Sequence, residues 1–271
     1  MVVDSHVTSS NFKCHSHGCF VYLCGFCARS VTFYCRHGGC CVAGWEWARL
    51  SGVRSQIGRI GFSVLIGVVC FWVFNFNLQK ASLYISPLLW GLALYWVVRY
   101  PAPLLWRHVV SRLLFGVFVL LTTWTALVVL KQSDDFVVWV LLLMGLIWGA
   151  DSGAYFAGRA FGKRKLAKFV SPGKSWEGVI GGLVLTQVGV VIFAILSGFT
   201  LTQWSILTVI ALLTSSVSVL GDLTESLFKR HEKLKDSSHL IPGHGGVMDR
   251  VDSLTAAAPI YVLLLSLAGW L

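Results

Sequence analysis

Long uncharged runs of apolar residues recur along the chain and are separated by short polar connections. The runs are about 17 to 22 residues long, and a helix of that length crosses a hydrocarbon layer of roughly 30 Å. A soluble core needs apolar faces rather than apolar runs, so the pattern predicts an all-α fold, a polytopic integral membrane helical bundle. Seven spans are predicted, at residues 57–76, 83–98, 113–130, 136–150, 179–199, 204–220 and 254–271.

Composition supports the membrane class and limits the partners. Of the 271 residues, 56% are hydrophobic and 13% are charged, which is more apolar than a soluble domain of this length requires. The net charge of +10 comes from basic residues in short connections, not from a soluble face with interleaved aromatic residues. We therefore expect no nucleic-acid partner, and we assign the positive charge to cytoplasmic loops and to anionic phosphate ligands.

The basic residues alternate between successive connections. Lys80 alone follows the first span and Lys131 alone follows the third, whereas Arg49 and Arg54 precede the first span and the connections after the second and fourth spans are strongly basic. Because Lys and Arg are retained on the cytoplasmic side, the even-numbered connections are predicted to face the cytoplasm of a bacterial-type inner membrane. The connection after the fourth span carries Arg159, Lys163, Arg164, Lys165, Lys168 and Lys174.

The first 41 residues differ from everything that follows. Seven of the eight cysteines lie there, without helical or strand periodicity. We therefore divide the chain into an atypical Cys/His-rich segment, residues 1–41, and a membrane-embedded domain, residues 42–271. A zinc site is one interpretation, since Cys24 and Cys27 form a C-x-x-C, but a second well-spaced half is missing. An aberrant or replaced N-terminus is the favoured interpretation.

Half of the acidic residues are concentrated near the C-terminus. Six of the twelve lie between Asp222 and Asp252. A solvated loop explains some of them, but Asp222 follows an apolar run directly, where a lone carboxylate costs on the order of 2 kcal/mol unless a cation accompanies it. If the helices continue through these segments, Glu225, Ser226 and Lys229 share a face with Asp222, and Asp249 and Asp252 share another.

Two acidic helix faces at a membrane surface favour Mg²⁺ held together with a phosphate. Their oxygen ligands are hard, and no cysteines or histidines are clustered with them. Between the two faces lies "IPGHGG", where Gly245 and Gly246 allow backbone amides to approach an anion and Pro242 stiffens the turn. His244 is expected to add a hydrogen bond, with a general-base role as the weaker alternative.

A second polar cluster follows the fourth span. Asp151 closes an apolar run and is either a buried structural carboxylate or a site residue. "SPGKS" is not a phosphate-binding P-loop, because Lys168 stands where that motif needs glycine. Ser171, Lys174 and the neighbouring basic residues nevertheless form a cationic, hydroxyl-rich loop suited to a polyphosphate. A polybasic loop lying on anionic lipid is the alternative.

The stretch "SLFKRHEKLKDSSHLIPGHGGVMDRVDS", residues 226–253, closely resembles the signature of the phosphatidate cytidylyltransferase family in its S-x-x-K-R, K-D, H-G-G and D-R-x-D elements. "WGADSGAY", "SPGKSWEG" and "LGDLTES" also resemble that family, so the resemblance covers about residues 43–271 and not the text before. It implies transfer of CMP from CTP to phosphatidate, with Mg²⁺ and a second, monovalent cation such as K⁺.

The resemblance and the residue patterns together give the expected site. Asp222 and Asp249 are expected to hold the metal, with Asp252 and Glu225 as supporting ligands, and Lys174 and His244 are also expected at the catalytic centre. Two other classes remain open, a CTP-dependent polyprenol or phytol kinase and a multispan anion transporter, as does a homodimer. The residues expected to bind substrate are Ser171, Lys174, Ser226, Lys229, Arg230, Gly245, Gly246 and Arg250.

Overall fold

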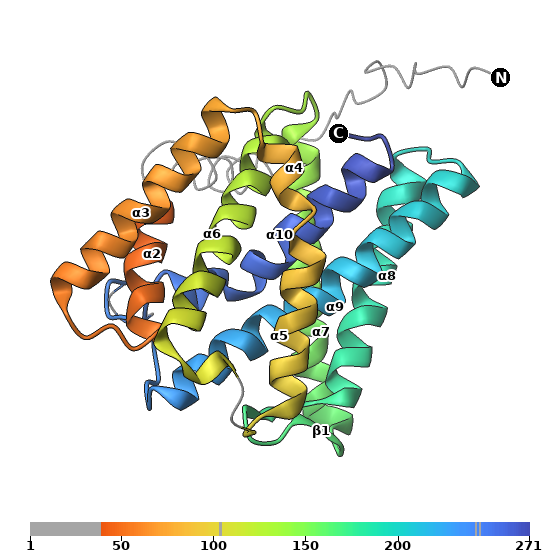
Figure 1. The fold of residues 1–271 in the computed structure, drawn as a ribbon. Coiled ribbons are helices and arrows are strands. Elements are labelled where there is room, and N and C mark those ends of the chain that lie inside the picture. Colours follow the sequence, from red (N-terminus) through yellow and green to blue (C-terminus); the bar gives the residue numbers. More distant parts are fainter. Residues whose placement is uncertain (1–38, 103–104, 242, 244) are drawn as a thin grey trace.

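The computed structural model describes residues 39–102, 105–241, 243 and 245–271 (Figure 1). Helices dominate this part of the chain, which confirms the all-α prediction. Besides the helices there are a short 3₁₀ turn, η1 (Leu105–Arg107), and one small hairpin of strands β1 (Lys165–Ala167) and β2 (Ser171–Ser175). The helices are α2 (Gly39–Leu50), α3 (Gln56–Asn75), α4 (Gln79–Leu83), α5 (Ser86–Arg99), α6 (Val109–Lys131), α7 (Phe136–Phe161), α8 (Trp176–Leu196), α9 (Leu201–His231) and α10 (Met248–Leu267).

Seven helical segments of the described residues are long and apolar enough to cross a membrane, in agreement with the seven predicted spans. The second of them joins α4 and α5. Two helices extend well beyond the predicted apolar segments: α7 continues to Phe161 and α9 continues to His231. Hydropathy marks where a run of apolar residues ends, whereas a helix continues until a cap or a turn residue stops it. The α7 extension carries Asp151 and Arg159, and the α9 extension carries Asp222, Glu225 and Lys229.

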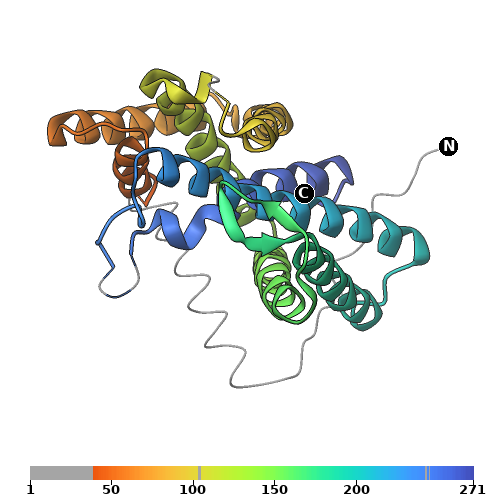
Figure 2. The same cartoon turned by 90° about the horizontal axis from the view of Figure 1, so that it is seen from below.

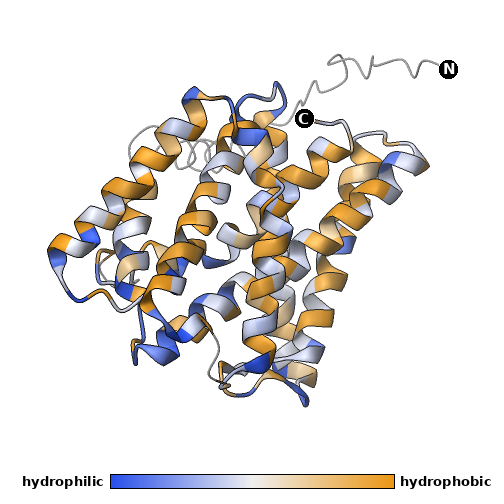
Figure 3. Ribbon diagram, in the orientation of Figure 1, coloured by the Kyte–Doolittle hydropathy of each residue, from blue (hydrophilic) through white to orange (hydrophobic). Residues whose placement is uncertain are grey.

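The outer faces of the bundle are apolar, as Figure 3 shows. On α8 the side chains of Ile180, Val184, Val188 and Ile192 are all exposed, and residues four apart lie on one face of a helix. A continuous exposed apolar stripe is unfavourable in water and suits contact with lipid tails. The chain is therefore an integral membrane protein.

Aromatic side chains anchor α2 to the other helices. The ring of Trp47 lies 5.7 Å from that of Phe228 on α9 and 6.1 Å from that of Phe115 on α6. Trp96 of α5 packs against the same two phenylalanines. The Trp47 indole Nε1 also donates a 2.9 Å hydrogen bond to the carbonyl of Arg112, so its polar atom is satisfied in the buried cluster.

Helix α2 begins at Gly39, inside the segment that we separated as residues 1–41. Cys40 packs in the hydrophobic core with Trp47. Residues 39–41 thus belong to α2, and the division of the chain after residue 41 stays a prediction. The predictions for the atypical segment, including the zinc alternative, otherwise fall on residues 1–38, which lie outside the described residues.

The hairpin was not predicted from the sequence. Strands β1 and β2 pair antiparallel, with Lys165 opposite Ser175 and Ala167 opposite Ser171. Figure 2, seen from the hairpin end, shows the strands over the ends of α7 and α8. The Glu177 carboxylate at the start of α8 accepts hydrogen bonds from the backbone N–H groups of Lys163 and Arg164. The basic connection between α7 and α8 is thus an ordered hairpin that is hydrogen-bonded to the start of α8.

A buried ion pair joins α6 to the end of α9, and its loss tests this packing. The Arg112 side chain is 1% exposed; its Nη2 lies 2.7 Å from Glu232 Oε1 and donates to the carbonyl of Ser51 at 2.9 Å. We expect Arg112→Ala to destabilise the protein by roughly 3 kcal/mol, because it leaves these acceptors without their partner. Thermal unfolding in detergent measures the effect. The exposed Arg107→Ala is the control, and equal melting temperatures for the two variants would contradict the assignment.

Candidate active site

Helices α9 and α10 approach each other closely at Gly221. A Cβ atom at this position would lie 2.5 Å from the carbonyl oxygen of Asp252 and 2.8 Å from the Cβ of Ala256. Only a residue without a side chain permits this contact. The close approach brings Asp222, the next residue on α9, toward Asp252 on α10.

The four acidic residues expected to bind metal lie at this contact. Asp222 and Glu225 project from α9, and Asp249 and Asp252 from the first turns of α10. Glu225 is 2% exposed, and its carboxylate is ion-paired with Lys229. Glu225 interacts electrostatically with Asp249 and Asp252, and Asp252 interacts with Asp222. The structure therefore brings together the acidic faces that the sequence predicted separately.

Two lysines lie among these carboxylates. Lys174 Nζ, from β2, is 2.6 Å from Asp222 Oδ2, and the Ser226 hydroxyl donates to Asp222 Oδ1 at 3.2 Å. Lys229 Nζ, from α9, is 3.3 Å from Glu225 Oε1 and 3.1 Å from Asp249 Oδ1. The ammonium groups offset the repulsion between carboxylates in a poorly solvated place.

A polar cavity of about 560 Å³ opens beside Lys174 and Asp222. Its volume falls within the usual range for small-molecule sites. Asp151 lines the cavity and interacts electrostatically with Lys174 and Asp222, which favours the site interpretation over a separate structural carboxylate. The other lining residues are Ala154, Tyr155, Gly158, Arg159, Gly173, Ser175, Gly178, Val179 and Val219.

Asp249 is held by the loop that precedes α10. Its Oδ2 accepts hydrogen bonds from the backbone N–H of Gly246 at 2.7 Å and from the N–H and hydroxyl of Ser237 at 2.9 and 3.0 Å. Its Oδ1 faces Lys229. In this geometry the Gly246 amide serves Asp249, whereas the sequence analysis assigned it to an anion.

The remaining predicted site residues occupy different places. Ser171 begins β2 and is not among the residues that line the cavity. Arg230 Nε donates to the carbonyl of Val170 at 3.4 Å and so contacts the hairpin. Arg250 lies in the first turn of α10, and the Gly245 carbonyl accepts from the Ile241 N–H. His244 lies outside the described residues. These four described residues keep their predicted roles as predictions.

Sequence reasoning missed Glu46 of α2. This residue is 0% exposed, and its carboxylate accepts hydrogen bonds from the residues on either side of the glycine turn. The available signal was a single acidic residue between Trp45 and Trp47, in a segment with few other polar positions.

Among the described residues, no three His, Cys, Asp or Glu side chains form a ready-made metal site. The lysine ammonium groups instead lie between the carboxylates. The donor set still consists of hard carboxylate oxygens, among them the buried carboxylate of Glu225, which Lys229 pairs with on one oxygen. These residues fit a hard cation better than a soft one.

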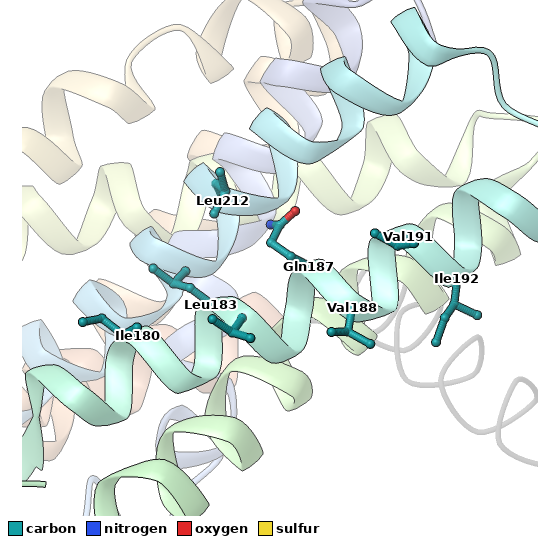
Figure 4. Close-up of a pocket in the computed structure, with 8 residues that line it drawn as sticks. Ile180, Leu183, Gln187, Val188, Val191, Ile192 and Leu212 are labelled. Atoms are coloured by element: carbon teal, nitrogen blue, oxygen red, sulfur yellow. The ribbon is translucent and has the colours of Figure 1, made fainter. Parts of the chain in front are cut away.

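An apolar groove of about 450 Å³ runs along α8 and α9 beyond the polar cavity (Figure 4). Val179 lines the cavity and Ile180, the next residue of α8, lines the groove. Gln187 is the one polar residue among those that line the groove, and its Nε2 atom is buried without a hydrogen-bond partner. The other lining residues are Leu183, Val184, Val188, Val191, Ile192 and Leu212.

Comparisons with known proteins agree with this arrangement. The sequence model described as "Cytidylyltransferase family" matches residues 15–268, so the match starts further toward the N-terminus than the resemblance noted above. The chain is 43% identical over 254 residues to the phosphatidate cytidylyltransferase of Pseudomonas aeruginosa, covering 92% of this chain and 94% of that protein. It is 42% identical to the Haemophilus influenzae protein of the same name, covering 80% and 83%, and 31% identical to the Bacillus subtilis protein, covering 78% and 91%.

The contact at Gly221 can be tested by adding one methyl group. We expect Gly221→Ala to cost about 1–3 kcal/mol of stability, because the new Cβ would press on the α10 backbone. Gly189→Ala, on the exposed side of α8 with nothing within 4 Å of the added Cβ, is the matched control and should be neutral or stabilising. Melting temperatures in detergent compare the two, and an unchanged value for Gly221→Ala would refute the close contact.

Proposed function

The chain belongs to the cytidylyltransferase family, and from this premise we propose how its cavity carries out the reaction after which its relatives are named. The enzyme transfers CMP from CTP to phosphatidate, giving CDP-diacylglycerol and pyrophosphate in phospholipid biosynthesis. The observation that carries our proposal is the cavity in which Lys174 meets Asp222, next to the acidic side chains of α9 and α10.

Both substrates are polyanions, so the main barrier is electrostatic. An oxygen of the phosphatidate phosphate attacks the α-phosphorus of CTP, and the bond to the β-phosphate breaks to release pyrophosphate. The phosphate is already ionised at neutral pH, so no strong base is required. Negative charge accumulates as the two reactants meet, and positive groups held in place beforehand lower that barrier.

Lys174 is suited to bind the triphosphate. It lies on β2, which is joined to the ends of α7 and α8, and its ammonium group reaches the cavity. When CTP enters, the ammonium group exchanges its contact with Asp222 for contacts with phosphate oxygens. Ser226, which donates to Asp222, keeps that carboxylate oriented during the exchange. Arg159 lines the same cavity and adds positive charge.

Asp222, Glu225, Asp249 and Asp252 would hold Mg²⁺. Bound there, the ion would neutralise charge on the triphosphate and orient it for in-line attack. Glu225 supports this assignment because its buried carboxylate lies with Asp249 and Asp252, and the single ammonium group of Lys229 leaves an excess of negative charge that a cation would offset. The second, monovalent cation and the homodimer rest on the resemblance alone.

The apolar groove is suited to an acyl chain of phosphatidate. It extends along α8 from Ile180 to Ile192, which at about 1.5 Å per residue is roughly 18 Å. One leaflet of the hydrocarbon layer is about 15 Å deep. The groove is therefore long enough to hold an acyl chain across one leaflet. A lipid bound in this way would place its phosphate in the cavity without leaving the membrane.

The cavity is proposed to face the cytoplasm of a bacterial-type inner membrane. The hairpin, the end of α9 and the start of α10 carry most of the basic residues of the second half of the chain. The hairpin and the end of α9 lie at one end of the bundle (Figure 1), and Lys and Arg are retained on the cytoplasmic side. CTP is a soluble polyanion, and this orientation exposes the cavity to it.

Removal of one carboxylate tests the reaction and the site together. We expect wild-type membranes supplied with CTP, phosphatidate and Mg²⁺ to release pyrophosphate and form CDP-diacylglycerol. Asp222→Asn should lower this rate at least 100-fold, because an amide cannot balance the cationic charge. Asp135→Asn should retain full activity, because Asp135 is exposed at the start of α7, whereas the cavity is lined by residues near the end of that helix. Release of CDP instead of pyrophosphate would indicate a kinase, and an active Asp222→Asn would exclude the assigned role.

The groove is tested by a bulky substitution. We expect Val184→Trp to raise the KM for long-chain phosphatidate several-fold, because the indole occupies part of the groove, and to leave the KM for CTP unchanged. Phosphatidate with six-carbon chains should be less affected. Val64→Trp on α3 is a matched control, since Val64 is 58% exposed and Val184 is 59% exposed. The same KM for long-chain phosphatidate in both variants would argue against this path.

A further inference from the structure

Glu46 is buried on α2 but belongs structurally to the site. Its Oε1 accepts hydrogen bonds from the Ser238 hydroxyl and, at 3.0 Å, from the backbone N–H of Val247. Its Oε2 accepts from the N–H of Met248 at 2.6 Å and from the Ser237 hydroxyl at 3.3 Å. Donors of this kind on both oxygens offset the cost of burying a carboxylate.

Two of these donors are the first N–H groups of α10. The first N–H groups of a helix have no partner within the helix, and no side chain of α10 itself caps this end. The Glu46 carboxylate supplies the missing acceptor from a helix about 200 residues earlier in the chain. Its negative charge also lies at the positive end of the helix dipole.

The same loop residues hold Asp249. The Ser237 hydroxyl lies 3.3 Å from Glu46 Oε2 and 3.0 Å from Asp249 Oδ2, so its single proton is shared between the two carboxylates. Arg49, one turn after Glu46 on α2, donates to the Ser237 carbonyl at 2.9 Å. A Cβ on Gly246 would lie 2.7 Å from Glu46 Oε1, so the loop passes close to the carboxylate. A connected set of hydrogen bonds thus leads from α2 to Asp249 and on to Lys229.

We propose that Glu46 is a positioning residue for the reaction. From α2 it holds both Ser237 and Ser238 and the start of α10, and it thereby fixes Asp249 against Lys229. The proposal rests on the proposed function, because it assigns Asp249 and Lys229 to the reacting site. Glu46 itself contacts neither substrate and acts through Ser237 and the α10 backbone.

Glu46→Gln is the test, because the amide keeps the size of the side chain and replaces one acceptor by a donor. Whichever carboxylate oxygen is replaced, the new NH₂ group would point at the N–H and hydroxyl groups that now donate to that oxygen. We expect kcat to fall about 10- to 100-fold, the range found when groups that orient a metal ligand are changed. The KM for long-chain phosphatidate should change less than two-fold, since the groove on α8 is remote from the loop.

Hydrogen exchange provides a readout that is independent of activity. We expect amide exchange in residues 237–248 to accelerate in Glu46→Gln, while exchange in α7 and α8 stays as in the wild type. Asp134→Asn, an exposed acid-to-amide change before α7, is the control and should alter neither quantity. Ser238→Ala combined with Glu46→Gln should lower kcat less than the product of the two single effects, because both remove the same hydrogen bond.

Two results would overturn the proposal. One is unchanged kcat and unchanged loop exchange in Glu46→Gln. The other is faster exchange throughout the protein, with a lower melting temperature and normal kcat per folded molecule, which is the behaviour of a residue that only stabilises the fold. Failure of the proposed function would appear differently, as absence of CDP-diacylglycerol formation by the wild type, and the exchange measurement would still decide the role of Glu46 in holding the loop.

Discussion

Repulsion among carboxylates in an apolar bundle is the constraint on which the rest of this structure depends. Asp222, Glu225, Asp249 and Asp252 are brought together by the contact of α9 with α10, and ionising all four side by side is unfavourable because Glu225 and Asp252 are largely removed from water. Lys174 and Lys229 offset part of it. The hairpin places the Lys174 ammonium group beside Asp222. The loop before α10 holds the Asp249 carboxylate in a fixed orientation.

The sequence predicted the spans and the acidic faces for a physical reason. Apolar runs in a membrane leave little choice of structure, since every backbone polar group must be satisfied within a helix. The residues Asp222, Glu225 and Ser226 follow their span without a break, so helical spacing placed them on one face, as the structure does. The pair Asp249 and Asp252 was placed by the same argument at the start of α10.

Long-range partners were beyond this reasoning. Glu46 is separated from Met248 by 202 positions, and helical spacing contains no information about such a pair. The hairpin was missed because its strands are short and their text, "KLA" and "SPGKS", has no alternation of polar and apolar residues. The contact of Arg230 with Val170 depends on that hairpin, so it could not be predicted either.

The exposed apolar stripe on α8 determines how the concentration of the lipid substrate is to be expressed. A groove whose walls face the hydrocarbon admits its lipid sideways, within two dimensions. Moving an acyl chain into water costs about 0.8 kcal/mol per CH₂ group, and a substrate that never leaves the leaflet avoids that cost entirely. Saturation by phosphatidate then depends on its mole fraction among the surrounding lipids, not on its amount per litre, so dilution of the bilayer with other phospholipids acts on this enzyme as a fall in substrate supply.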